Sequence, residues 1–155
     1  MRVAISILAL CCAAGSALGQ AQPEFQQPCS SHVQSTWSED MRKAALTDCS
    51  FYEEAQRDGA AAWVKYAAAD AAMSGINGRE QIRAAFEKSY AVPGFRLLWH
   101  PTGGSEFGNF VVTNGSYERY SLDKDGKQVI SHGHYVTVWQ KQKDGSFLYI
   151  FDGGE

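Results

Sequence analysis

The chain has 155 residues, which is enough for one domain with a hydrophobic core and too few for two comfortable ones. Hydrophobic residues make up 45% and charged residues 20%, the usual composition of a globular domain. The formal net charge is −3 and the two signs are interspersed, so there is no basic stripe to neutralise phosphates, which argues against nucleic-acid binding.

The first 19 residues have the layout of a secretory signal peptide. Arg2 supplies a positive charge, Val3–Ala14 forms an apolar run, and small residues lead up to Gly19. We expect cleavage after Gly19, or alternatively after Ala21, and an exported protein that is either periplasmic or secreted. The apolar run is too short to span a bilayer permanently, so the sequence predicts no stable membrane anchor.

Residues 20–36 are rich in Gln, Ser and Pro, which predicts a flexible N-terminal arm ahead of a domain at 37–155. Removal of the leader leaves two of the four cysteines, Cys29 and Cys49. In an oxidising compartment we expect this pair to form a disulfide that ties the arm to the first helix. The chain-entropy model values such a bridge at roughly 3 kcal/mol. The alternative is two unpaired thiols.

Two helices are predicted at the start of the domain. The first begins near Trp37 and ends at Gly59, which acts as its C-terminal cap. The second is short, carries Trp63 and Tyr66, and is expected to end near Asp70. The positions of the first helix that fall on helical spacing are Trp37, Met41, Ala44, Ala45, Asp48, Phe51, Tyr52 and Ala55.

A third helix is predicted to begin around residues 77–80. Asn77 and Glu80 stand three residues apart, which is the spacing of a capping box. Pro93-Gly94 would stop the helix. Its buried stripe would consist of Ile82, Ala85, Phe86 and Tyr90.

From Phe95 onward the apolar period changes to two, which predicts β-strands. The candidate strands are Phe95–His100, Phe107–Leu122, Val129–Gln142 and Ser146–Asp152. Turn residues at 101–104, 123–126 and 143–145 join successive strands by short loops, so we expect an antiparallel meander. Helices followed by strands indicate an α+β fold.

Five stretches of the domain carry a resemblance to a known family. They lie at Phe51–Gly59, Ala68–Ala71, Gly78–Ile82, Trp99–Glu118 and Gly133–Phe147. Taken in order, they resemble the SnoaL-like group of the nuclear transport factor 2-like superfamily, and most closely its domain-of-unknown-function 4440 branch. The resemblance covers roughly residues 37–152. It implies a cone-shaped, cystatin-like fold in which three N-terminal helices pack on a curved antiparallel sheet and close a pocket.

Related folds use that pocket for ketosteroid isomerisation, polyketide cyclisation, dehydration or binding alone, so the fold leaves the chemistry open. A ketosteroid-isomerase site needs a carboxylate base and an oxyanion hole made of a Tyr and a protonated Asp. Tyr52 lies seven residues before Gly59, which resembles the spacing of the catalytic Tyr in that family. The base would follow Asp70, at residues 74–76, and the second acid would lie at 135–137. Neither stretch contains a carboxylate, so this chemistry is disfavoured, and Asp70 is interpreted as a helix cap.

His132 and His134 would point to the same face of a strand, a geometry that can present two imidazoles to one metal. A third ligand, such as His100 or Asp152, would arrive only by coincidence of folding. The alternate positions of this strand, which include Tyr135, are more apolar, so we expect them to form the concave face and the two histidines to lie on the convex face. We therefore favour a structural or interfacial role for the histidines and predict neither a metal site nor a cofactor.

Aromatic side chains would line a cone-shaped pocket, since such a cone leaves part of its inner face uncovered. The predicted pocket residues are Tyr52, Tyr66, Trp99 and Tyr135. Asp152 could reach the pocket mouth, although closure of the hairpin is the favoured role.

The leading hypothesis is an exported module that binds a small apolar or aromatic molecule and forms a homodimer through the convex sheet. The alternatives are a cofactor-free isomerase, cyclase or dehydratase with Tyr52 as a hydrogen-bond donor, and a packed scaffold without a ligand.

Overall fold

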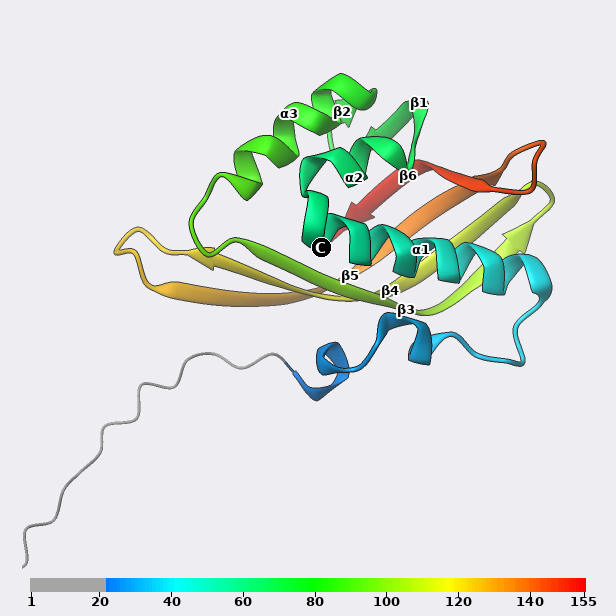
Figure 1. Cartoon of the computed structure of the whole chain (residues 1–155), viewed down its shortest axis with the longest axis horizontal. Coiled ribbons are helices and arrows are strands. Elements are labelled where there is room, and N and C mark those ends of the chain that lie inside the picture. The colour runs from blue at the N-terminus through cyan, green and yellow to red at the C-terminus, as the bar shows by residue number, and fades with distance from the viewer. Residues whose placement is uncertain (1–21) are drawn as a thin grey trace, which may run out of the picture.

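Within residues 22–155, three α-helices cover one face of a six-stranded sheet, and a short N-terminal arm crosses the opposite face (Figure 1). The computed structural model describes residues 22–155, so the signal peptide predicted at 1–19 lies outside the described residues. The arm contains two 3-10 turns, η1 (Pro23–Gln26) and η2 (Cys29–His32). The helices are α1 (Glu39–Asp58), α2 (Ala60–Lys65) and α3 (Arg79–Tyr90). The strands are β1 (Ala67–Met73), β2 (Ile76–Asn77), β3 (Arg96–Phe107), β4 (Phe110–Leu122), β5 (Gln128–Lys141) and β6 (Phe147–Gly154).

The strand order in the sheet is β2-β1-β6-β5-β4-β3. The four long strands, β3 to β6, pair antiparallel in sequence order, which confirms the predicted meander and the α+β fold class. β1 then joins the free side of β6 in parallel, and β2 closes that edge. No helix in the described part of the chain is long and apolar enough to cross a membrane.

α1 forms close to where its apolar spacing predicts. The side chain of Ser38 caps its start by accepting a hydrogen bond from the amide of Met41 (3.2 Å). Gly59 ends the helix with a positive φ of 56°, a conformation that suits glycine. The buried stripe of the helix includes Phe51, whose ring contacts Trp63, Trp99 and Tyr149 at the centre of the core.

The predicted end of the second helix near Asp70 is wrong, because α2 stops at Lys65 and the following alanine-rich segment forms β1. Alanine has the highest helix propensity, so the local sequence favours a helix here. Ala67, Ala68 and Ala71 are buried, and the backbone of β1 pairs with β6. Tertiary packing therefore overrides the local preference.

The capping box predicted for the third helix is absent from the structure. Gly78 occupies the N-cap position of α3 with a φ of 81°, and no side chain caps it. Asn77 instead belongs to β2, where it pairs with Ala72. The strand pairing thus takes up the residue that would have served as the cap.

The turn predicted at residues 101–104 is also wrong, since β3 continues through it to Phe107. The strand absorbs the irregular segment by a register shift between Pro101 and Gly103. Gly104 is required by close packing: a Cβ there would lie 2.1 Å from the carbonyl oxygen of Val112 and 2.4 Å from Cε of Met41. The chain reverses only after Phe107, at Gly108.

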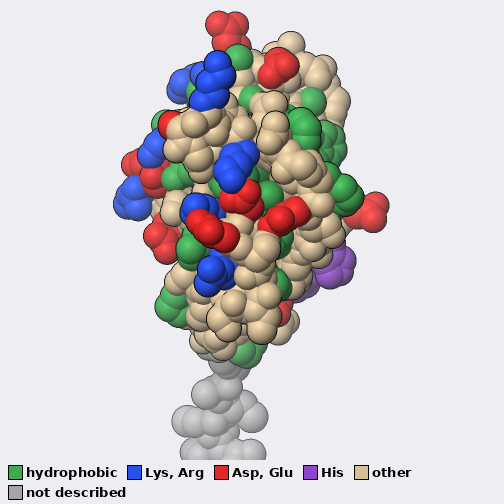
Figure 2. Space-filling view, turned by 90° about the vertical axis from the view of Figure 1, so that its right-hand side faces the viewer, with side chains coloured by type: hydrophobic (Ala, Val, Ile, Leu, Met, Phe, Trp, Pro, Cys, Tyr) green, Lys and Arg blue, Asp and Glu red, His purple; other side chains and the backbone are tan. Residues whose placement is uncertain are grey.

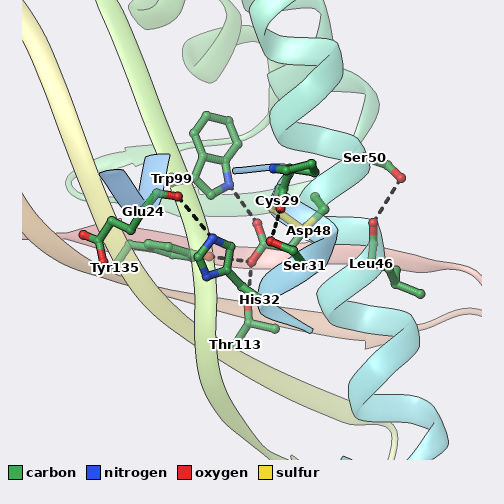
Figure 3. Close-up of a disulfide and its surroundings, with 12 residues drawn as sticks. Glu24, Cys29, Ser31, His32, Leu46, Asp48, Ser50, Trp99, Thr113 and Tyr135 are labelled. Atoms are coloured by element: carbon green, nitrogen blue, oxygen red, sulfur yellow. Dashed lines mark hydrogen bonds between the residues drawn. A yellow bond between two sulfur atoms is a disulfide. The ribbon is translucent and has the colours of Figure 1, made fainter. Parts of the chain in front are cut away.

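The N-terminal arm is tied to the domain by a disulfide between Cys29 of η2 and Cys49 of α1, with the Cα atoms 5.4 Å apart (Figure 3). Beyond the bridge, the amide of Gln22 donates a hydrogen bond to Glu118 of β4 (3.0 Å). The arm also covers His100 of β3, whose ring stacks on that of His32. It is therefore docked on the sheet face that the helices leave uncovered.

Charged side chains of both signs are interspersed on the end of the molecule shown in Figure 2. Two of the ion pairs involve the first turn of α1, Lys43 with Glu39 at 2.6 Å and Lys141 with Asp40 at 2.5 Å. The second pair joins the helix to β5. Solvent screens exposed ion pairs, so these two orient the helix start more than they stabilise the fold.

Candidate functional site

A cavity of about 290 Å³ lies between the helices and the concave face of the sheet. Its walls are mainly aromatic. The helices contribute Phe51, Trp63 and Phe86, and the strands contribute Trp99, Tyr117 and Tyr135. Trp63 and Phe86 stack face to face with ring centres 3.5 Å apart, so these two lining residues fix each other's orientation. Ser74, Ser89, Arg119 and Asp152 supply the polar side chains of the lining.

Asp48 of α1 lies directly behind two of these walls and is 1% exposed. Its carboxylate accepts three hydrogen bonds of 2.9 Å, from Nε1 of Trp99, Oγ1 of Thr113 and the hydroxyl of Tyr135 (Figure 3). Burial raises the pKa of Asp48 to about 6, although the three donors oppose the shift. Because one carboxylate holds both Trp99 and Tyr135, it fixes the orientation of two cavity walls.

Tyr135 stays protonated in this arrangement. Burial raises the pKa of its hydroxyl well above 10, and the neighbouring charge of Asp48 raises it further. The hydroxyl of Tyr135 donates its hydrogen bond to Asp48. Toward the cavity it can therefore act only as a hydrogen-bond acceptor.

Asp152 provides the carboxyl group of the cavity itself. It lies near the end of β6, opposite Thr137 of β5, and accepts a hydrogen bond of 2.6 Å from the Thr137 hydroxyl. Burial raises the pKa of Asp152 to about 7, and the charge of Asp48 adds to the shift. Near neutral pH the group is therefore divided between its acid and its base form, the state in which a carboxyl can accept or donate a proton.

The structure places the predicted pocket residues in two groups. Trp99 and Tyr135 line the cavity, whereas Tyr52 and Tyr66 lie outside it. Tyr52 follows Phe51 by one position on α1 and is turned away from it by about 100°. It packs edge-on against Trp99 and lies with Phe25 and His100 around a small crevice under the arm.

Tyr66 follows the last residue of α2 and directs its hydroxyl to Glu54 of α1 (3.0 Å). Burial and the Glu54 charge raise its pKa. Neither Tyr52 nor Tyr66 is among the residues that line this cavity, so the lining does not support a hydrogen bond from Tyr52 to a molecule bound there.

The histidines also lie away from the cavity. His132 and His134 are exposed on the sheet face opposite the helices, and Nδ1 of His132 is 3.4 Å from Oε1 of Glu118. Tyr135, Thr137 and Trp139 are buried on the helix side, so the concave face has the parity that the sequence favours. Within residues 22–155, no three His, Cys, Asp or Glu side chains are grouped so that they could hold a metal ion.

No family model matches the chain, and no curated protein matches it. Solved structures do. A ketosteroid isomerase-like protein from Erwinia carotovora atroseptica is 11% identical, with a TM-score of 0.66 over 76% of this chain and 96% of that one. A candidate dehydratase of the nuclear transport factor 2-like family from Streptomyces avermitilis is 14% identical, with a TM-score of 0.61 over 74% and 94%.

A nuclear transport factor 2-like superfamily protein from Salmonella enterica is 11% identical, with a TM-score of 0.59 over 75% of this chain and 89% of that one. Identities this low carry no information on substrates, but the shared architecture extends over most of each molecule. The chain therefore has the nuclear transport factor 2-like fold, with three helices on a six-stranded and mostly antiparallel sheet.

Proposed function

We propose that the chain is a SnoaL-like domain whose cavity binds a small, ring-bearing and largely apolar molecule. The observation that carries the proposal is the cavity of about 290 Å³, which the molecule's own aromatic side chains leave unfilled. This volume is near the lower end of ligand pockets, roughly 300–1,000 Å³. The aromatic lining suits a ring-bearing molecule, and the unfilled space counts against a packed scaffold.

Two helical serines allow a matched test. Ser89 of α3 lines the cavity, whereas Ser50 of α1 is exposed, and each donates its hydroxyl to the carbonyl four residues earlier. Ser89→Phe should fill the cavity and weaken binding of 2-naphthamide by at least about tenfold, while Ser50→Phe should leave it unchanged. The titration can be followed by tryptophan fluorescence, because Trp63 and Trp99 lie in the cavity wall. Undiminished binding by Ser89→Phe would refute the assignment of the cavity.

A second candidate function is proton transfer within the cavity, as an isomerase or dehydratase would require. The observation that favours it is Asp152, a carboxyl group in an apolar cavity with a pKa of about 7 and a fixed partner in Thr137. Under this proposal Asp152, and not Tyr52, is the catalytic residue. The titrating carboxyl would take a proton from a carbon of the bound ring and return it elsewhere, with no need for a cofactor.

The probe for this candidate is 5-nitrobenzisoxazole, in which removal of the ring C–H proton by a base breaks the N–O bond and releases a coloured phenolate. Because the pKa of Asp152 is raised, the carboxylate form grows as the pH rises, so the rate should climb through about pH 7 and then level off. Asp152→Asn should lower it by about 100-fold or more. The control is Asp70→Asn, an exposed carboxylate on β1. A rate that survives in Asp152→Asn would exclude this function.

A further inference from the structure

One lining residue of the cavity, Arg119, carries a positive charge that has no ion-pair partner within residues 22–155. Arg119 of β4 shares its parity with Tyr117 and faces the cavity with it. Its guanidinium lies 5.7 Å from the centre of the Phe95 ring. Among residues 22–155 it forms no ion pair or hydrogen bond, whereas Arg79, for example, donates two hydrogen bonds to the carbonyl of Ala67.

The ring of Phe95 leaves the hydrogen-bonding capacity of Arg119 intact. The contact is a cation–π attraction to the ring, and none of the five N–H donors of the guanidinium has a hydrogen-bond acceptor within residues 22–155. Those donors match the two oxygens of a carboxylate in a bidentate pair. Phe95 therefore holds the cation in place at the cavity without neutralising it.

The acidic group of the cavity lies at the other end. Asp152 pairs with Thr137, which in turn lies opposite Thr113 of β4. Arg119 is six residues further along β4 than Thr113, which corresponds to roughly 20 Å of strand. The two charged groups do not form an ion pair, and the aromatic walls lie between them. A ligand anion would be repelled near Asp152 and attracted near Arg119.

We propose that Arg119 is the anion-binding residue of the cavity, and that its ligand is an amphipathic anion: an aromatic or alicyclic ring that carries a carboxylate. The carboxylate pairs with Arg119, and the ring extends along the aromatic walls toward Asp152. This inference rests on the proposed function, because it names the class of molecule that the same cavity takes. Arg119 sets the specificity of binding and has no part in proton transfer.

The chain contains a close control for Arg119. Arg96 of the neighbouring strand β3 also lies over an aromatic ring, that of Tyr120, at 5.0 Å. The backbone of Arg96 pairs with Tyr120, one position from Arg119, but Arg96 does not line the cavity. Both substitutions remove a cation–π contact and one unit of charge from the same region of the sheet. Only one of them removes the cation from the cavity.

The experiment compares 2-naphthoate with 2-naphthamide, which have nearly the same shape and differ in charge. Wild type should bind the naphthoate more tightly by on the order of tenfold. Arg119→Gln should lose this preference while it keeps its affinity for the naphthamide, which reports an intact cavity. Arg119→Lys should retain part of the preference, and Arg96→Gln should retain all of it.

Three results would overturn the inference. Equal binding of both probes by wild type, or a preference that survives in Arg119→Gln, would show that Arg119 does not select an anion, while leaving the cavity as a binding site. Failure of wild type to bind either probe would overturn both the inference and the proposed function. Raised salt should reduce the preference for the naphthoate and not the affinity for the naphthamide, because only the former depends on charge.

Discussion

The carboxylate of Asp48 joins the first helix to three strands, since Trp99, Thr113 and Tyr135 come from β3, β4 and β5. The hydroxyl of Thr113 also accepts a hydrogen bond, from Nε1 of Trp139 (2.9 Å). Each donor in this network has one acceptor, and the network is closed to solvent. A charged acceptor in such a position is required by its donors even though its own burial is unfavourable.

Asp48→Asn should therefore destabilise the protein by about 2–4 kcal/mol. The amide of Asn has one accepting oxygen and presents an NH₂ group where a donor already points, so one of the three partners is left unsatisfied. Urea unfolding measures the loss, and Asp70→Asn, which removes an exposed acid, should change stability by less than about 0.5 kcal/mol. A loss no larger than that of the control would show that the network adds nothing to stability.

At the scale of elements, α1 and the meander were predictable because their signals are local. The apolar spacing and Gly59 both act within one helix, and the turns predicted at 123–126 and 143–145 each depend on their own few residues, unlike the one predicted at 101–104. The segment of β1 was not predictable in this way. Its alanines favour a helix, and only the remote strand β6 makes it extended.

The position of Asp152 in the cavity was not predictable from the sequence, because it depends on a β-bulge. Phe147 and Tyr149 are buried, so a strict alternation along β6 would turn Phe151 inward and Asp152 outward. The register shifts between Val138 and Trp139 of β5 instead, which leaves Phe151 41% exposed and brings Asp152 to the cavity. No local sequence pattern predicts this bulge. By contrast, an acid on the apolar stripe of α1 was a visible sign of a buried role for Asp48.

Across the whole molecule, the two faces of the sheet serve different purposes. The concave face forms the cavity, while the arm covers part of the other face over β3 and β4. A homodimer through that face, which remains a prediction, would have to use the uncovered strands β5 and β6, where Val136 and Phe151 are exposed. The disulfide keeps the arm attached to α1 and is of the kind formed in oxidising compartments, which supports the proposal that the protein is exported.

Docking of the arm should depend on pH through His100, which is 2% exposed beneath it. Within residues 22–155 both ring nitrogens of His100 are without a hydrogen-bond partner, and the ring contacts those of His32, stacked at 3.7 Å, and Phe25, at 5.0 Å. Burial lowers the pKa of His100, the charge of His32 lowers it further, and Glu24, with Oε2 at 3.8 Å from Nε2, opposes them. The folded protein therefore binds this proton less readily than the unfolded chain does.

The free energy of unfolding should therefore fall as the pH drops below about 6.5, the pKa of a histidine in the unfolded chain. Above that pH the protein should have its full stability. Wild type and His100→Phe, which keeps an aromatic ring under the arm, can be compared by urea unfolding at about pH 8 and about pH 5. Wild type should lose more stability on acidification than the variant does. Titration of Asp48 and Asp152 acts in the opposite direction, because a raised carboxyl pKa makes the folded state more stable in acid, but both proteins share it. The exposed His134→Phe should behave like wild type, and an equal pH dependence in His100→Phe would show that the arm does not sense this proton.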